Sequence, residues 1–93
     1  MPSPVSVELP EKLTIVSVDA LHEQFEPLLQ NSAELILSAE SVARVDTAGL
    51  QIMASVCQSL RKQNISFSWS GVPEVLRESA AQLGMTELIS LPE

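Results

Sequence analysis

Residues 45–50 read Val45-Asp46-Thr47-Ala48-Gly49-Leu50, and they lead from an apolar segment into the longest predicted helix. Asp46 or Thr47 can cap that helix by accepting hydrogen bonds from its first free backbone N–H groups. Gly49 lies in the first turn, where glycine costs about 1 kcal/mol of helix propensity against alanine. The glycine therefore indicates either a close approach of another backbone or a surface that is kept clear. We predict the helix from about Thr47 to Gln63, because one helical stripe is apolar: Leu50, Ile52, Met53, Ala54, Val56, Cys57 and Leu60.

Three segments before this helix have the patterns of strands. Glu34–Ser38 is a short apolar run, typical of a strand that is covered on both faces. Val5–Leu9 alternates apolar and polar residues, and Leu13–Val16 follows after a break at Pro10-Glu11. Because so few residues separate these two strands, we expect them to pair as a hairpin.

A second helix is predicted over Ala20–Gln30, since its large apolar residues recur at helical spacing and Ser17 or Asp19 can cap it. Pro27 interrupts the pattern, because an interior proline removes a hydrogen bond and crowds the preceding turn. This helix is expected either to kink near Glu23 or to begin its regular part late.

The last third of the chain predicts one strand and one helix. Ile65–Ser70 alternates strictly between large apolar residues and serines, which is typical of a strand near a sheet edge with one covered face. Its aromatic residues, Phe67 and Trp69, are expected in the core. A helix starts near Pro73 and ends at Gly84 in a left-handed cap, and Thr86–Leu91 can add one more helical turn.

The order of elements predicts the fold class. Strands alternate with helices after the first hairpin, a pattern that favours parallel strands joined by right-handed crossover helices. We therefore predict a single α/β domain over residues 1–93, with a four-stranded mixed sheet and helices packed mainly on one face.

Charge and composition exclude several kinds of partner. The net charge is −7, from 12 acidic and five scattered basic residues, so nucleic acid and anionic membrane surfaces are disfavoured. No apolar run approaches the length of a membrane span, and no signal peptide is apparent, so we expect a cytoplasmic protein with no direct membrane insertion. Cys57 is the single cysteine and is expected to be a buried, inert thiol.

The sequence does not favour catalysis. His22 is the single histidine and has no cysteine or hydroxyl partner at motif spacing. No metal-ligand spacing exists, and the three glycines form no phosphate-binding loop. We therefore expect no catalytic residue, no metal and no cofactor.

The residues alone leave two interpretations of the Asp46–Leu50 segment open. In one, Asp-Thr is only a helix cap and Gly49 only a packing glycine. In the other, the Thr47 hydroxyl is a functional group, and its phosphorylation would add a charge of about −1.5 to −2 beside Asp46.

The same segment resembles the signature of STAS domains, a family named for sulphate transporters and anti-sigma factor antagonists. The likeness covers nearly the whole chain in length and element order. It is carried by Leu35-Ile36-Leu37, Val42, Val45-Asp46-Thr47-Ala48-Gly49-Leu50-Gln51, Leu13-Thr14-Ile15, Leu76 and Leu83-Gly84-Met85.

This resemblance implies a non-enzymatic bacterial signalling module that switches between protein partners. In anti-sigma factor antagonists, the anti-sigma factor is a serine/threonine kinase with a histidine-kinase-like ATPase fold. It phosphorylates the residue that matches Thr47, and a metal-dependent phosphatase reverses the reaction. Thr47 is thus the expected phosphoacceptor. The expected partner-binding residues are Asp46, Thr47, Ala48, Gly49, Leu50 and Gln51.

Two departures and two alternatives accompany this resemblance. Many antagonists carry an aspartate where this chain has Ser38 and a serine where it has Glu40, which alters the surroundings of the phosphorylation site. Threonine at position 47 is also common in the small STAS subunit of the phospholipid-transport ABC system, where this end contacts the ATPase. Stand-alone STAS proteins of chemotaxis systems share Leu-Thr-Ile and Asp-Thr-Ala-Gly-Leu-Gln. The partner is accordingly a kinase and phosphatase, a chemotaxis protein or an ABC ATPase, and the oligomeric state stays open.

Overall fold

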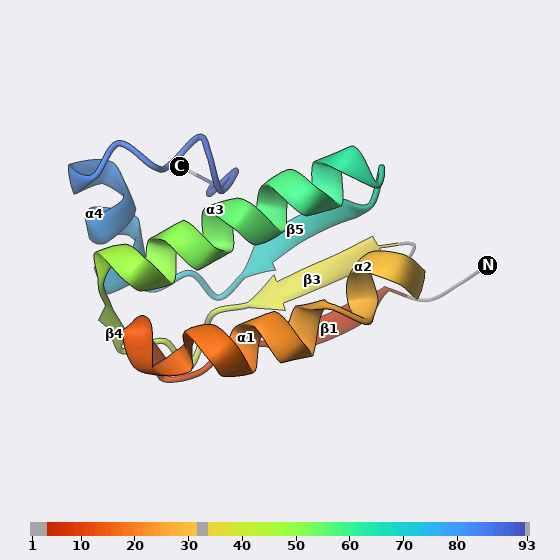
Figure 1. The fold of residues 1–93 in the computed structure, drawn as a ribbon. Helices are drawn as coiled ribbons and strands as arrows, with labels where there is room; N and C mark the ends of the chain where they lie inside the picture. The colour runs from red at the N-terminus through yellow and green to blue at the C-terminus, as the bar shows by residue number, and fades with distance from the viewer. Residues whose placement is uncertain (1–3, 32–33, 93) are drawn as a thin grey trace.

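Two sets of parallel strands form the framework of the computed structural model, which describes residues 4–31 and 34–92. The larger sheet has the order β1-β3-β5, with Val5–Glu8, Glu34–Ser38 and Ser66–Ser70. The smaller sheet pairs β2, Lys12–Leu13, with β4, Arg44–Val45. Helices α1, Val18–Phe25, and α3, Thr47–Lys62, lie side by side on one face of the larger sheet (Figure 1), so the predicted α/β class and one-sided packing are confirmed.

The predicted hairpin is wrong. β1 pairs in parallel with β3, with Val7 opposite Leu37, whereas β2 pairs with β4. Leu9 N–H extends the β1–β3 ladder by donating to the Ser38 carbonyl at 2.9 Å, which carries the chain past the end of the sheet. Every pairing is therefore parallel, and the strands divide into three plus two instead of one four-stranded mixed sheet.

The central strand β3 is covered on one face instead of both. Leu35 and Leu37 are fully buried toward the helices, whereas Ile36 on the other face is only half-buried. Ile36 lies between Ser6 of β1 and Ser68 of β5, and both serines are exposed. The predicted edge position of β5, with its serines outward, is confirmed.

The helix expected over Ala20–Gln30 is divided at Pro27. α1 ends at Phe25, and the four-residue helix α2 spans Leu28–Asn31. A short 3-10 helix, η1, Ile15–Ser17, precedes α1 where a strand was expected. Ser17 lies at the N-cap of α1, but its hydroxyl donates to the Lys12 carbonyl at 2.6 Å and makes no cap hydrogen bond.

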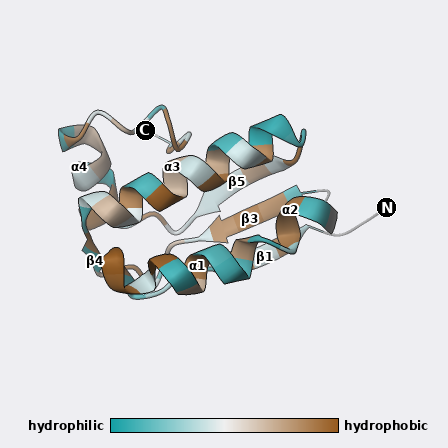
Figure 2. Cartoon of the chain, in the orientation of Figure 1, coloured by the Kyte–Doolittle hydropathy of each residue, from teal (hydrophilic) through white to brown (hydrophobic). Residues whose placement is uncertain are grey.

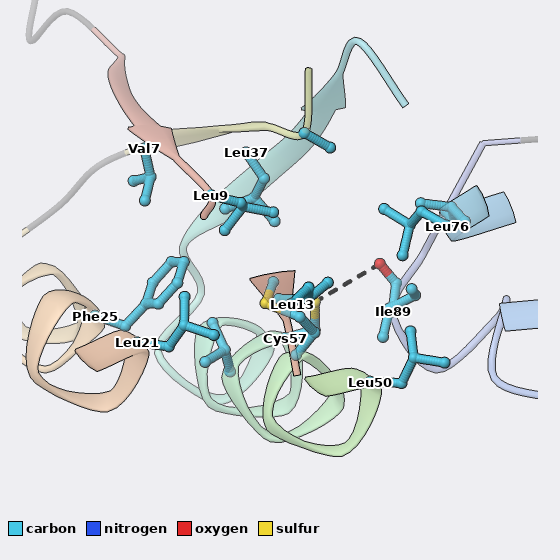
Figure 3. Close-up of a cluster of buried hydrophobic side chains, with 14 of the residues drawn as sticks. Val7, Leu9, Leu13, Leu21, Phe25, Leu37, Leu50, Cys57, Leu76 and Ile89 are labelled. Atoms are coloured by element: carbon cyan, nitrogen blue, oxygen red, sulfur yellow. Dashed lines mark hydrogen bonds between the residues drawn. The ribbon is translucent and has the colours of Figure 1, made fainter. Parts of the chain in front are cut away.

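The C-terminal part closes the core over α3. The helix α4 spans Glu74–Gln82, and Gly84 has a φ of +66°, which confirms the left-handed cap. Residues 86–90 form hydrogen-bonded turns instead of a further helix. Ile89 is fully buried, and its carbonyl accepts a hydrogen bond from Trp69 Nε1 at 2.8 Å. The same carbonyl accepts from the Cys57 thiol at 3.6 Å (Figure 3).

The core is apolar throughout. No polar or charged residue is buried in the described ranges, and the labelled side chains of Figure 3 come from the strands, the helices and the C-terminal turns. Within those same ranges, no helix has the length and apolar character needed to cross a membrane.

The first turn of α3 rests directly on the backbone of β2. A Cβ atom placed on Gly49 would lie 1.8 Å from the Leu13 carbonyl oxygen and 2.9 Å from the Thr14 nitrogen, far inside van der Waals contact. Gly49 is buried, and Leu50 beside it is fully buried. Of the two explanations for this glycine, a close backbone approach is the one that the geometry supports.

We expect Gly49→Ala to destabilise the fold by about 1–3 kcal/mol, because a backbone carbonyl cannot move aside for the new methyl group. At an exposed helix position the same change would stabilise by up to about 1 kcal/mol, so the sign of the effect is diagnostic. Chemical denaturation measures it, with Ser55→Ala on the exposed side of α3 as the control. A Gly49→Ala protein as stable as wild type would contradict the close approach.

Burial raises the pKa of the Cys57 thiol to about 12, against a lesser opposing effect of Arg61. The folded state therefore keeps a proton that the unfolded chain releases above its ordinary value of 9.0. This contribution to stability is complete below that value and is lost as the pH rises toward about 12. We expect wild type to lose stability relative to Cys57→Ala as the pH rises above about 9 toward about 12, as measured by urea unfolding. Equal stability changes in the two proteins would contradict the burial of a protonated thiol.

Candidate functional site

The N-terminus of α3 is organised by the carboxylate of Asp46. Asp46 has extended backbone angles, φ −130° and ψ 177°, and occupies the N-cap position directly after β4. Its Oδ1 accepts a hydrogen bond from Gly49 N–H at 2.8 Å, and its backbone carbonyl accepts from Leu50 N–H at 3.1 Å. Asp46 is therefore the cap, and Thr47 is the first residue of the helix.

The second oxygen of Asp46 binds a different part of the chain. Oδ2 accepts a hydrogen bond from Ile15 N–H at 3.1 Å, 31 residues away in the sequence. The Asp46 N–H in turn donates to the Leu13 carbonyl at 3.2 Å. One half-buried residue thus joins η1, the end of β2 and the start of α3.

The segment held by Asp46 exposes two large apolar side chains. Ile15 is 65% exposed and Val16 is 73% exposed, and the turn that contains them is brown beside β4 in Figure 2. Thr14 stabilises this turn, because its hydroxyl accepts from Val16 N–H at 3.4 Å. Exposed aliphatic residues that are held in a defined turn are typical of a protein-binding surface.

Thr47 lies exposed between this turn and α4. Its side chain makes no hydrogen bond or ion pair within residues 4–31 and 34–92, so the hydroxyl is open to solvent. A hollow of about 260 Å³ adjoins it, bordered by Val45, Asp46 and Thr47 on one side and by the end of α4 on the other. The α4 border consists of Ser79, Gln82 and the 48% exposed Leu83.

The six residues predicted to bind a partner do not all reach the surface. Thr47 and Gln51 are exposed, and Ala48 and Asp46 are half-buried. Gly49 and Leu50 are buried against the body of the protein, so they support the surface and do not form it.

Sequence reasoning missed the neighbours that complete this surface. Ile15 and Val16 were expected in a strand, and Leu83 was expected only as the last residue of a helix that ends at Gly84. No local signal marks Ser79 or Gln82, since the fold alone brings the end of α4 to Thr47. We name the surface formed by Ile15, Val16, Thr47, Ala48, Gln51 and Leu83 the Thr47 surface.

The other chemically active side chains lie away from the Thr47 surface. His22 is exposed on α1, and Cys57 is buried and protonated. Among the residues that the structure describes, no group of three or more His, Cys, Asp or Glu side chains is arranged to hold a metal ion.

We expect Asp46→Asn to separate the two roles of the carboxylate. The asparagine oxygen can still cap Gly49 N–H, whereas its NH₂ group cannot accept from Ile15 N–H. Helix stability should change little, and Ile15 N–H should exchange with solvent at least about tenfold faster, equivalent to 1.4 kcal/mol. Hydrogen exchange followed by NMR measures this, with Leu50 N–H as the internal control. Unchanged exchange at Ile15 would refute the bridging role.

Comparison with known proteins agrees with this fold. No curated protein matches the chain. The crystal structure of a sulfate transporter family protein from Wolinella succinogenes is similar, with a TM-score of 0.76 and 19% identity over 91% of this chain and 70% of that one. The NMR structure of the protein TM1081 has a TM-score of 0.74 and 12% identity over 90% and 69% of the two chains. At these identities the likeness concerns the fold alone.

A family model gives the identification. The model described as "Mlab, STAS domain" matches residues 2–91, which is nearly the entire chain. STAS domains are in general binding modules without enzymatic activity that mediate protein–protein interactions. The chain belongs to the STAS domain family.

Proposed function

We propose that this STAS domain is a regulatory module of the anti-sigma factor antagonist type, which binds a protein partner through the Thr47 surface and releases it when Thr47 is phosphorylated. The proposal rests on the position of Thr47. Its side chain is exposed and makes no hydrogen bond within the described residues, and exposed aliphatic side chains are part of the same surface. The 3-10 helix η1, which carries Ile15 and Val16, packs against α3 and is hydrogen-bonded to Asp46, and Leu83 borders the same hollow as Thr47.

The physical chemistry of this surface suits a switch. A partner that covers the aliphatic residues removes water from the Thr47 hydroxyl, which is a small neutral group. A phosphate there adds about −1.5 to −2 charges, which would have to be desolvated beside the Asp46 carboxylate. Both oxygens of that carboxylate already accept backbone hydrogen bonds, so Asp46 keeps its place and its charge opposes the phosphate.

The partners proposed for this cycle are an anti-sigma-like serine/threonine kinase, with a histidine-kinase-like ATPase fold, and a phosphatase. The same STAS module could instead serve a chemotaxis system. In either case the phosphoacceptor is Thr47 and the contacts come from the Thr47 surface, with Gly49 and Leu50 beneath it.

A second candidate function uses the same surface without phosphorylation. The module would then be a subunit that contacts the ATPase of a phospholipid-transport ABC system. Its supporting observation is that Ile15 and Val16 are exposed in the turn that is hydrogen-bonded to Asp46. An aliphatic contact area of this kind needs the threonine only to fit against the partner.

We expect Thr47→Glu to weaken partner binding at least about tenfold, or 1.4 kcal/mol, because it buries a charge in the interface. Thr47→Val, which keeps the shape and removes the hydroxyl, should bind the partner nearly normally but accept no phosphate. The measurement is affinity capture from the native lysate with quantitative mass spectrometry, followed by calorimetry with the recovered partner.

The matched control is Ser68→Glu, which places the same charge on the exposed face of β5. Recovery of a kinase that is lost with Thr47→Glu supports the partner switch, and recovery of an ABC ATPase supports the second candidate. Equal affinity of wild type and Thr47→Glu for the recovered partner would contradict both.

A further inference from the structure

A second surface feature lies along the two helices that cover the sheet. A cavity of about 150 Å³ opens between α1 and α3, which run side by side in Figure 1. Its apolar lining consists of Phe25 and Leu29 from the α1–α2 side and Ile52 and Val56 from α3. Apolar cavities of this volume take up benzene, so the space suits one aromatic or leucine-sized side chain.

The lining residues follow the pattern of helix packing. On the α1–α2 side they include positions 22, 25, 26 and 29, and on α3 they are positions 52, 55, 56 and 59. The α3 set has the i, i+3, i+4, i+7 spacing of a single helix stripe, and the other set keeps the same spacing across the junction of α1 and α2 at Pro27. The groove therefore extends for about two turns, or about 10 Å, between two neighbouring helices. Such a groove is shaped to receive a third helix.

The two sides of the groove differ in charge. Glu26 lines the cavity together with His22, and Asp19 and Glu23 precede Glu26 on α1 by seven and three residues; all three carboxylates are exposed. The chain has no lysine or arginine between Lys12 and Arg44, and none of these carboxylates forms an ion pair within the described residues. The α3 side is neutral, with Ser55 and Ser59 in the lining.

We infer that this groove binds an amphipathic helix of a partner protein, with a large apolar side chain in the cavity and lysines or arginines along the α1 side. The unpaired carboxylates supply the charge complementarity, and the apolar floor supplies the anchor point. This surface is separate from the phosphoacceptor, since Ile52 lies more than one helical turn beyond Thr47.

Other occupants fit the charges less well. An anionic membrane or a nucleic acid would be repelled by the carboxylates. A second copy of the chain carries the same net charge of −7, and α1, α2 and α4 contain at most one basic residue each. A helix of a different protein that carries both apolar and basic side chains can fill the cavity and pair with the carboxylates on the α1 side.

The test uses two capped, alanine-rich peptides of about 20 residues, above the length of about 12–15 residues below which isolated helices are marginal in water. One carries leucines at i, i+3, i+4 and i+7 with lysines along one edge of that stripe, and the other has glutamates in place of the lysines. Titration followed by ¹⁵N NMR should shift the amides of Ile52, Ser55 and Ser59 with the lysine peptide. Its affinity should exceed that of the glutamate peptide at least tenfold.

Charge reversal provides the decisive comparison. The double variant Glu23→Lys, Glu26→Lys should prefer the glutamate peptide, while the matched variant Glu74→Lys, Glu78→Lys on α4 should keep the preference of wild type. Absence of saturable binding at millimolar peptide, shifts that map outside the groove, or equal effects of the two double variants would each overturn the inference. These outcomes leave the role of Thr47 untouched, because no step of the test depends on it.

Discussion

The contact between the first turn of α3 and the end of β2 is the constraint on which the arrangement of this domain depends. Because Gly49 has no side chain, its Cα can lie against the Leu13 carbonyl. The Asp46 carboxylate then accepts a hydrogen bond from each segment, one from Gly49 N–H in α3 and one from Ile15 N–H in η1. Any side chain at position 49 would separate the two segments, and the hydrogen bond to Ile15 depends on their proximity. The position of the exposed turn at Ile15 therefore depends on the close packing of the buried Gly49.

This junction explains why a small domain can offer a defined binding surface. Aliphatic side chains in solvent are ordered only if the backbone beneath them is fixed, and here the backbone of Ile15 is bonded to the cap of the longest helix. The core below consists of apolar residues, and in the part of the chain that the structure describes no buried side-chain nitrogen or oxygen lacks a hydrogen-bond partner. Thr47 therefore follows a helix cap that is hydrogen-bonded both to α3 and to η1.

The sequence predicted the elements that are determined by residues close together in the chain. The apolar stripe of α3, the alternation in β5 and the cap at Gly84 each predicted the observed element, and Asp46 was one of two residues expected to cap α3. Pairing partners were not predictable in the same way, since β2 pairs with β4, some 32 residues later, and not with its neighbour β1. The residues around Thr47 were missed for the same reason, because only the tertiary fold brings Ile15, Val16 and Leu83 to it.

Site-specific photo-crosslinking in living cells shows which surface of the domain a partner protein contacts. A photoreactive amino acid replaces Val16 or Leu83 on the Thr47 surface, with Ser6 and Ser68 on the open sheet face as the comparison positions. We expect Val16 and Leu83 to crosslink to the same partner protein, Ser6 and Ser68 not to crosslink to it, and Thr47→Glu to abolish the product. A partner that crosslinks from the sheet face and not from Val16 or Leu83 would contradict this expectation.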